Sequence, residues 1–310
     1  MHPKQHSILH RMGVYCKHFA LGFALICTQL TLGSASAQTS EPSAQTSRQA
    51  TALSEYNKSD LQQMINDYTQ AIALKPNDVA AYALRGGAYF YLKDYSSAIR
   101  DFTQAIALNP NDVGGYAVRG LAYHEFKDYS SAIRDYNQAI ALNPNDAATY
   151  SNRGLAYNAL KDHTSAIRDY NQAIALNPND AATYSNRGLA YNALKDHTSA
   201  IRDFNQAIAL NPNDAGLYAS RGNAYGNLKD YSSAIRDYNQ AIALNPNDAY
   251  AYGNRGVIYS KLKDYSSAIR DLTQAIALNP RFEMAYNNRA LSLALQNDYR
   301  NATRDARKAC

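Results

Sequence analysis

Side chains with hydrogen-bonding chemistry recur along this chain at multiples of one fixed spacing, 34 residues. An asparagine occupies one such position at Asn152, Asn186, Asn254 and Asn288. A side-chain amide both donates and accepts hydrogen bonds, which matches the donor and acceptor of a peptide unit. The peptide unit so matched could belong to another molecule or to the chain's own backbone, and the sequence leaves both alternatives open.

Arginine and aspartate recur with the same period. The arginines are Arg85, Arg119, Arg153, Arg187, Arg221, Arg255 and Arg289, and the aspartates are Asp101, Asp135, Asp169, Asp203, Asp237, Asp271 and Asp305. The two sets either pair with each other or are solvated rim charges that contribute less than about 1 kcal/mol each. Because every segment shares them, they indicate structural surface and not a catalytic pair.

The chain contains no pattern typical of a catalytic or metal centre. The motifs G-x-x-x-x-G-K-[ST], G-x-S-x-G and H-E-x-x-H do not occur. His163 and His197 occupy a position that is tyrosine in other segments, so we interpret them as packing substitutes and not as a metal pair. Cys310 is the only cysteine beyond the N-terminal leader, which excludes a disulfide framework and a thiol pair for zinc. We expect no enzyme activity, no metal and no cofactor.

Residues 1–37 are predicted to be a signal peptide, and residues 38–57 a flexible tether. A basic stretch precedes an apolar run from Phe19 to about Leu32, and an A-x-A pattern ends at Ala37. This run is shorter than the roughly 20 residues that a membrane-spanning helix needs. We therefore expect cleavage and a periplasmic or secreted protein. The alternative is a membrane anchor formed by an uncleaved signal.

The chain without this leader is close to neutral. The full sequence has a formal charge of +5, but three of its 31 basic residues and none of its 26 acidic residues lie in positions 1–37. The remaining charges are nearly balanced and interleaved in sign. This pattern excludes an electrostatic nucleic-acid binder.

The chemistry-bearing positions repeat because the chain itself repeats. Residues 145–178 and 179–212 are identical except that Tyr170 corresponds to Phe204. A segment copied head to tail must be able to pack against its own copy, which is typical of a solenoid. Prolines mark the period at Pro76, Pro110, Pro144, Pro178, Pro212, Pro246 and Pro280.

Each segment is predicted to form two helices. Tyr150, Gly154 and Tyr157 lie at i, i+4 and i+7, which predicts one helix over about residues 147–160. A second apolar stripe predicts another helix over about residues 163–176. The Asn-Pro-Asn-Asp run that follows it ends this helix and supplies capping oxygens for the next one.

The glycine in the first helix needs a compensating reason, since glycine costs about 1 kcal/mol relative to alanine there. We expect a close approach of the paired helix at Gly154, with Ala166 opposite. Lys161 and Asp162 are expected to form the turn between the helices. Tyrosines fill the larger core positions, where a ring can be buried while its hydroxyl reaches a polar edge.

The spacing of these residues resembles the tetratricopeptide repeat (TPR). The residues that carry the resemblance are Tyr150, Gly154, Tyr157, Ala166, Tyr170, Ala173 and Pro178. It implies an all-α solenoid, a right-handed superhelix of antiparallel helix pairs. The array would cover residues 58–310, as a half-repeat 58–76, full repeats 77–110, 111–144, 145–178, 179–212, 213–246 and 247–280, and a truncated repeat 281–310. One departure is arginine where the family usually has leucine, just before the glycine.

The resemblance implies binding of a protein or peptide segment on a concave surface lined by the first helices. In TPR proteins that carry an asparagine ladder, the amides hold the backbone of a bound peptide. The predicted groove residues are Asn152, Asn186, Asn254, Asn288, Leu155, Leu189, Asn158 and Asn192. Groove positions that depart from the repeated pattern are predicted to set selectivity, and they are Phe90, Tyr91, His124, Glu125, Tyr250, Lys261 and Met284.

We therefore expect a non-catalytic interaction scaffold, acting in a bacterial cell envelope. The alternative is a structural solenoid that associates with itself through an uncapped C-terminal repeat. The sequence does not name the partner.

Overall fold

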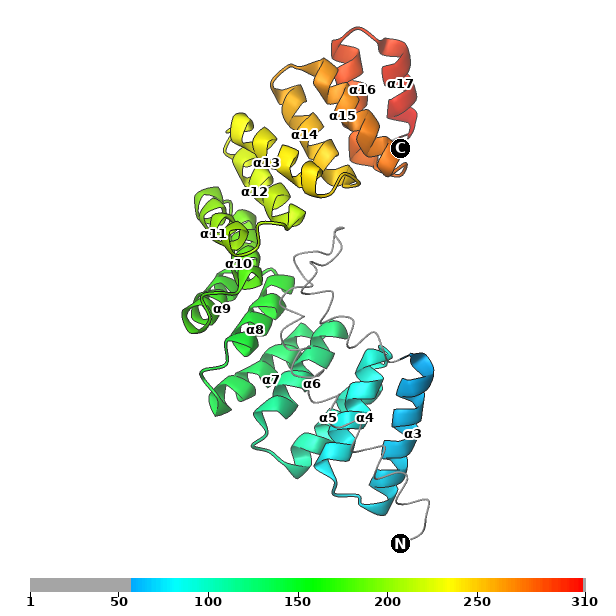
Figure 1. The fold of residues 1–310 in the computed structure, drawn as a ribbon, viewed down its shortest axis with the longest axis vertical. Coiled ribbons are helices and arrows are strands. Elements are labelled where there is room, and N and C mark those ends of the chain that lie inside the picture. Colours follow the sequence, from blue (N-terminus) through cyan, green and yellow to red (C-terminus); the bar gives the residue numbers. More distant parts are fainter. Residues whose placement is uncertain (1–56, 309–310) are drawn as a thin grey trace. The chain divides into compact units, whose positions relative to one another are not determined.

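The computed structural model describes residues 57–308, and every regular element in that range is an α-helix. The fifteen helices of this range fall into two compact units, and the chain passes from the first to the second between Asn179 and Asp180. Figure 1 shows each unit as a stack of antiparallel helix pairs. The predicted all-α solenoid of helix pairs is confirmed, whereas the predicted signal peptide 1–37 and nearly all of the predicted tether lie outside the described residues.

The helices of each unit alternate between a first and a second member of a pair. The first unit contains α3 (Lys58–Leu74), α4 (Val79–Tyr91), α5 (Tyr95–Leu108), α6 (Val113–Glu125), α7 (Tyr129–Leu142), α8 (Ala147–Ala159) and α9 (His163–Leu176). The second unit contains α10 (Ala181–Ala193), α11 (His197–Leu210), α12 (Ala215–Asn227), α13 (Tyr231–Leu244), α14 (Ala249–Lys261), α15 (Tyr265–Leu278), α16 (Glu283–Leu295) and α17 (Tyr299–Lys308). We call α4, α6, α8, α10, α12, α14 and α16 the first helices, and α3 and the others the second helices.

A residue in the left-handed region closes each turn from a first helix to its second helix, and it is lysine in every described turn except that from α16 to α17, which has Asn297. Lys161 has a φ of 63°, and its N–H donates to the carbonyl oxygen of Asn158 at 2.9 Å. The N–H of Asp162 donates to the carbonyl oxygen of Tyr157 at 2.9 Å, which completes a Schellman motif. The predicted turn at Lys161 and Asp162 is confirmed, and the helices on either side match the predicted ranges to within one residue.

Aspartates start the helices on both sides of this turn. Asp162 caps α9 by accepting a hydrogen bond from the backbone N–H of Ser165 at 3.1 Å, and Asp146 caps α8 through Ala148. Hydrogen bonds from the side chain and backbone of Ser165 lower the pKa of Asp162. The local sequence therefore fixes where each helix begins, and with it the register of the residues on the helix faces.

The core is built where a first-helix glycine such as Gly154 meets a large side chain of the second helix. A Cβ atom on Gly154 would lie 2.7 Å from a ring carbon of Tyr170. The predicted close approach is therefore present, and the Tyr170 ring lies nearest to Gly154. At the equivalent Gly256, a Cβ atom would lie 3.3 Å from the carbonyl oxygen of Ala268, the counterpart of Ala166. Glycine is unfavourable within a helix, but its lack of a side chain leaves space for the fully buried Tyr170 ring. This buried ring holds the two helices together.

The buried hydroxyl of this ring differs from copy to copy. Tyr238 donates a hydrogen bond to Asn223 Oδ1 at 2.7 Å, as the prediction of a hydroxyl at a polar edge requires. The hydroxyl of Tyr170 receives no such partner from the described residues, because Leu155 occupies the position of Asn223. For Tyr170 the prediction is wrong, and burial raises the pKa of its hydroxyl.

The arginine and aspartate ladders pair with each other, which confirms the first of the two alternatives. Arg153 Nε lies 2.7 Å from Asp169 Oδ2, and Nη2 lies 2.6 Å from Oδ1. Its Nη1 donates to Asn137 Oδ1 on the preceding second helix at 2.6 Å, and its guanidinium lies 5.5 Å from the centre of the Tyr150 ring. One arginine thus ties together α7, α8 and α9.

We call the bidentate arginine–aspartate pair the brace, and it recurs at every one of the seven predicted pairs. They are Arg85–Asp101, Arg119–Asp135, Arg153–Asp169, Arg187–Asp203, Arg221–Asp237, Arg255–Asp271 and Arg289–Asp305. The Asp169 side chain is only 4% exposed, so these are not solvated rim charges. At α3 the corresponding carboxylate, Asp67, accepts a hydrogen bond from Gln63 instead.

Candidate peptide-binding surface

The predicted groove residues all lie on first helices. In the first unit they are carried by α4, α6 and α8, and in the second unit by α10, α14 and α16. A brace such as that of Arg153 fixes its first helix against the second helices on both sides, so the register of these residues is set by buried contacts.

The asparagine ladder is not uniform in the structure. Asn152 is 3% exposed and Asn186 is 2% exposed, so both amides lie beneath the surface. Asn254 and Asn288 are half-buried. Amides so deeply covered as the first two present little area to a ligand, and their part in holding a peptide stays a prediction.

The two half-buried amides donate to groups of their own chain. Asn254 Nδ2 donates to Asn223 Oδ1 at 3.1 Å, and Asn288 Nδ2 donates to the carbonyl oxygen of Met284 at 2.8 Å. The alternative of bonding to the chain's own backbone therefore holds for the Asn288 donor, whereas the Asn254 donor bonds to a side chain of the same chain. Asn223 was not predicted as a site residue, although its signal was visible: a polar side chain where other repeats have Leu155 or Leu189.

The second row of predicted amides meets the histidines. Asn158 Oδ1 lies 2.6 Å from His163 Nδ1, and Asn192 Oδ1 lies 2.8 Å from His197 Nδ1. The histidines therefore do more than fill the space of a tyrosine, since each holds a first-helix amide across the turn. No group of three or more His, Cys, Asp or Glu side chains in residues 57–308 is arranged to hold a metal ion.

The predicted apolar groove residues differ in exposure. Leu155 on α8 is 8% exposed, whereas Leu189 on α10 is half-buried and packs against a core cluster that contains Phe204. Leu155 is therefore part of the interior more than of a binding surface.

The predicted selectivity residues of the first unit are brought together. Phe90 at the end of α4 lies edge-on to Tyr95, with ring centres 5.5 Å apart, and to Tyr91 at 6.3 Å. His124 Nδ1 on α6 lies 3.6 Å from Glu125 Oε1. We call Phe90, Tyr91, Tyr95, His124 and Glu125 the aromatic–acid cluster.

Glu125 interacts electrostatically with both His124 and Tyr95 of this cluster. The neighbouring His124 lowers the pKa of the Glu125 carboxyl, against the opposing effect of burial, and the Tyr95 hydroxyl adds to the lowering. Burial, with a smaller contribution from Glu125, raises the pKa of Tyr95. Glu125 is therefore anionic at neutral pH. Tyr95 was missed by sequence reasoning, although it follows Phe90 by five residues across the turn.

The predicted selectivity residues of the second unit form two separate groups. Tyr250 packs against Phe282, with ring centres 4.7 Å apart, and Met284 packs against the same core cluster. Lys261 lies at the other end of α14, with its ammonium 5.9 Å from the centre of the Tyr231 ring. The structure does not bring Lys261 together with Tyr250 and Met284.

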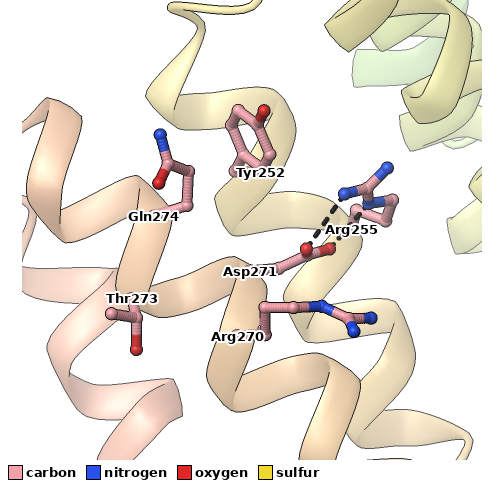
Figure 2. Close-up of a pocket in the computed structure, with 6 residues that line it drawn as sticks. All are labelled: Tyr252, Arg255, Arg270, Asp271, Thr273 and Gln274. Carbon is pink, nitrogen blue, oxygen red and sulfur yellow. Dashed lines mark hydrogen bonds and ion pairs between the residues drawn. The ribbon is translucent and has the colours of Figure 1, made fainter.

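A shallow pocket of about 480 Å³ lies between α14 and α15, and Figure 2 shows its lining. Its lining residues are Tyr252, Arg255, Arg270, Asp271, Thr273 and Gln274. Arg255 and Asp271 bond to each other there as one of the seven braces. The pocket is therefore a feature of the repeated framework, and none of the predicted site residues lies in it.

No helix within residues 57–308 is both long enough and apolar enough to span a bilayer.

Family models match most of the repeated region. Models described as tetratricopeptide repeat match residues 79–112, 147–180, 181–214, 204–236 and 222–291, and one described as TPR repeat matches residues 120–161. Together these matches cover more than half of the chain. No curated protein matches it.

Solved structures of tetratricopeptide repeat proteins have the same fold. The C-terminal part of a TPR repeat-containing protein from Cytophaga hutchinsonii is 20% identical, with a TM-score of 0.62 over 74% of this chain and 94% of that chain. YrrB, described as a TPR protein with an unusual peptide-binding site, is 22% identical, with a TM-score of 0.52 over 59% of this chain and 95% of that one.

A third match is a chain of the Cut9–Hcn1 hetero-tetramer of the APC/C. It is 24% identical, with a TM-score of 0.59. The match covers 76% of this chain and 46% of that chain. The repeated motif, the helix pairs with their glycine–aromatic contacts, the family models and these folds agree. The chain belongs to the tetratricopeptide repeat family.

Proposed function

We propose that this chain is a non-catalytic scaffold that captures a peptide or protein segment of a partner on the surface of its first helices. The observation that carries the proposal is the distribution of charge. On α4, α6 and α8 the charged residues other than histidine are three brace arginines, each paired with an aspartate, and Glu125. The rest of these helices is small, apolar or amide-bearing, which suits a peptide backbone and apolar side chains.

The unusual peptide-binding site of YrrB supports the idea that this fold accommodates a peptide. The likeness to YrrB shows the fold alone, so the residues that bind a peptide here are argued from this chain. Of the predicted groove amides, Asn254 and Asn288 of the ladder and the further amides Asn158 and Asn192 are half-buried, whereas Asn152 and Asn186 are buried.

Site-specific photo-crosslinking tests this proposal. A photoreactive amino acid at Asn158, on the first helix α8, is expected to crosslink a partner from a cell extract. The same amino acid at Gln172, exposed on the second helix α9, is the matched control and is expected to crosslink none. Crosslinking from Gln172 but not from Asn158 would contradict the proposed surface.

We also propose that the chain acts after export, in a bacterial cell envelope. The basic stretch, the short apolar run and the A-x-A pattern of residues 1–37 support this. Mass spectrometry of the protein purified from its native cells tests it. A mature N-terminus at Gln38 is expected, whereas an intact Met1 in a membrane fraction would favour the anchored alternative.

A second candidate function, self-association, has its own supporting observation. On α16, Leu291 is 57% exposed and Leu295 is 52% exposed, and Tyr299 on α17 is 64% exposed. Leu155, at the position of Leu291 in an earlier repeat, is 8% exposed. Sedimentation of a Cys310→Ser variant with and without Leu291→Glu tests this function: a dimer that Leu291→Glu dissociates supports it, and a monomer in both excludes it.

A further inference from the structure

We infer that the aromatic–acid cluster of the first unit is a subsite for a lysine or arginine side chain of the bound segment. This inference rests on the proposed function and names the chemistry of the partner. The subsite consists of the Glu125 carboxylate, the Tyr95 side chain that is hydrogen-bonded to it, and the Phe90 ring that packs against Tyr95.

The first argument is that Glu125 is an acid outside the framework of braces. Every aspartate of the ladder receives a bidentate arginine, whereas no lysine or arginine among the described residues lies within ion-pair distance of Glu125. Its nearest basic group is His124 at 3.6 Å, and the exposed Lys93 attracts it only over a longer distance. The Glu125 side chain is 32% exposed, so a ligand can reach it.

The second argument comes from the aromatic rings. The half-buried Tyr95 lies next to this carboxylate, and the half-buried Phe90 ring packs against Tyr95. Ring faces attract cations. The chain uses the same chemistry in its framework, where the Arg153 guanidinium lies 5.5 Å from the Tyr150 ring centre and bonds a carboxylate. A carboxylate with adjacent rings therefore offers a lysine or arginine both of the contacts that the brace arginines make.

The third argument is the position of Glu125 at the end of a helix. Glu125 is the last residue of α6, where the helix dipole places partial negative charge. A cation is favoured at such an end. An acidic side chain would be repelled there, and an apolar side chain would strip water from a carboxylate without replacing its interactions. The cluster therefore selects for a basic residue and against the other two classes.

Selection of random-sequence linear peptides displayed on phage tests the inference, with the full chain immobilised as bait. Selections are run in parallel on the wild type, on Glu125→Gln and on Glu283→Gln, the last being a matched loss of one exposed carboxylate in the second unit. Peptides enriched on the wild type and on Glu283→Gln are expected to share a lysine or arginine that those enriched on Glu125→Gln lack.

A double-mutant cycle then localises the effect. Replacing the shared basic residue of a selected peptide by norleucine is expected to weaken its binding to the wild type on the order of tenfold, the effect of one charge-assisted hydrogen bond. The same replacement is expected to leave binding to Glu125→Gln unchanged. Circular dichroism of Glu125→Gln checks that the variant is folded.

The outcomes separate this inference from the proposed function. Enriched peptides without a basic residue, or a basic preference that survives in Glu125→Gln, would overturn the subsite and leave peptide binding intact. Failure of any peptide to be enriched on the wild type would overturn both.

Discussion

The replacement Tyr170→Phe is expected to stabilise this protein. The Tyr170 ring is fully buried, and its hydroxyl receives no hydrogen bond from the described residues. A buried polar group without a partner costs about 1–3 kcal/mol, and phenylalanine keeps the ring while removing that group. We expect the free energy of unfolding to rise by about 1 kcal/mol. Phe204, at the same position of the next repeat, shows that the fold accepts this side chain.

Urea unfolding followed by circular dichroism measures the effect, as a higher midpoint at an unchanged slope. The matched control is Tyr238→Phe, because the Tyr238 hydroxyl donates to Asn223 Oδ1 at 2.7 Å. That variant is expected to lose about 1 kcal/mol, the net contribution of one hydrogen bond. If Tyr170→Phe lowers stability as much as Tyr238→Phe does, the Tyr170 hydroxyl has a partner and the reasoning is refuted.

Three further predictions concern the framework. Gly154→Ala should destabilise the protein by about 1–3 kcal/mol in the same urea titration, because the new Cβ would lie 2.7 Å from the Tyr170 ring. Gly222→Ala should lower the free energy of unfolding by less, because its Cβ would lie 3.1 Å from the Tyr238 ring. Arg153→Met should cost about 3 kcal/mol, because it leaves the buried Asp169 unpaired, and adding Asp169→Leu should restore most of that loss. Folding lowers the pKa of the capping carboxyl of Asp162. The stabilisation by this cap is therefore present above the ordinary aspartate pKa of about 4 and is lost as the pH falls below that value. In an acid titration followed by circular dichroism, Asp162→Asn should lose less helix than the wild type.

The helices and turns could be predicted from the sequence because their signals are local. The helix over 147–160 and the turn at Lys161 follow from apolar spacing and capping residues that lie within one segment. The pairing of the two charge ladders was visible as a shared period. The strength of this pairing could not be predicted, because the burial of Asp169 depends on three helices packing around it.

The contacts inside the core could be predicted only in part. The repeated glycine indicated a close approach, but spacing alone did not say whether Ala166 or Tyr170 lay opposite Gly154. Both residues face the first helix, one helical turn apart, and the side chain that fills the gap is decided by packing.

The candidate site was the least predictable part. The period placed Asn152 and Asn254 at equivalent positions, yet one is buried and the other half-buried. Exposure depends on the neighbouring helices, which differ between repeats even where the residue is the same. The contact between Asn158 and His163 crosses the turn, so an interpretation that treated groove and core as separate faces did not find it.

The central claim is that a partner segment binds to the first helices, and the affinity of two matched variants tests it most directly. In one variant Asn158, Asn192, Asn254 and Asn288 on first helices are changed to alanine. In the other, four exposed amides of second helices are changed to alanine, and they are Gln138, Gln172, Gln206 and Gln240.

Both variants lose four amides, and titration calorimetry with a peptide selected on the wild type compares them. At about 1 kcal/mol for each of the four lost hydrogen bonds, the first variant should bind on the order of a thousandfold more weakly, while the second binds as the wild type does. Equal affinities of the two variants, or a loss confined to the second, would contradict the account.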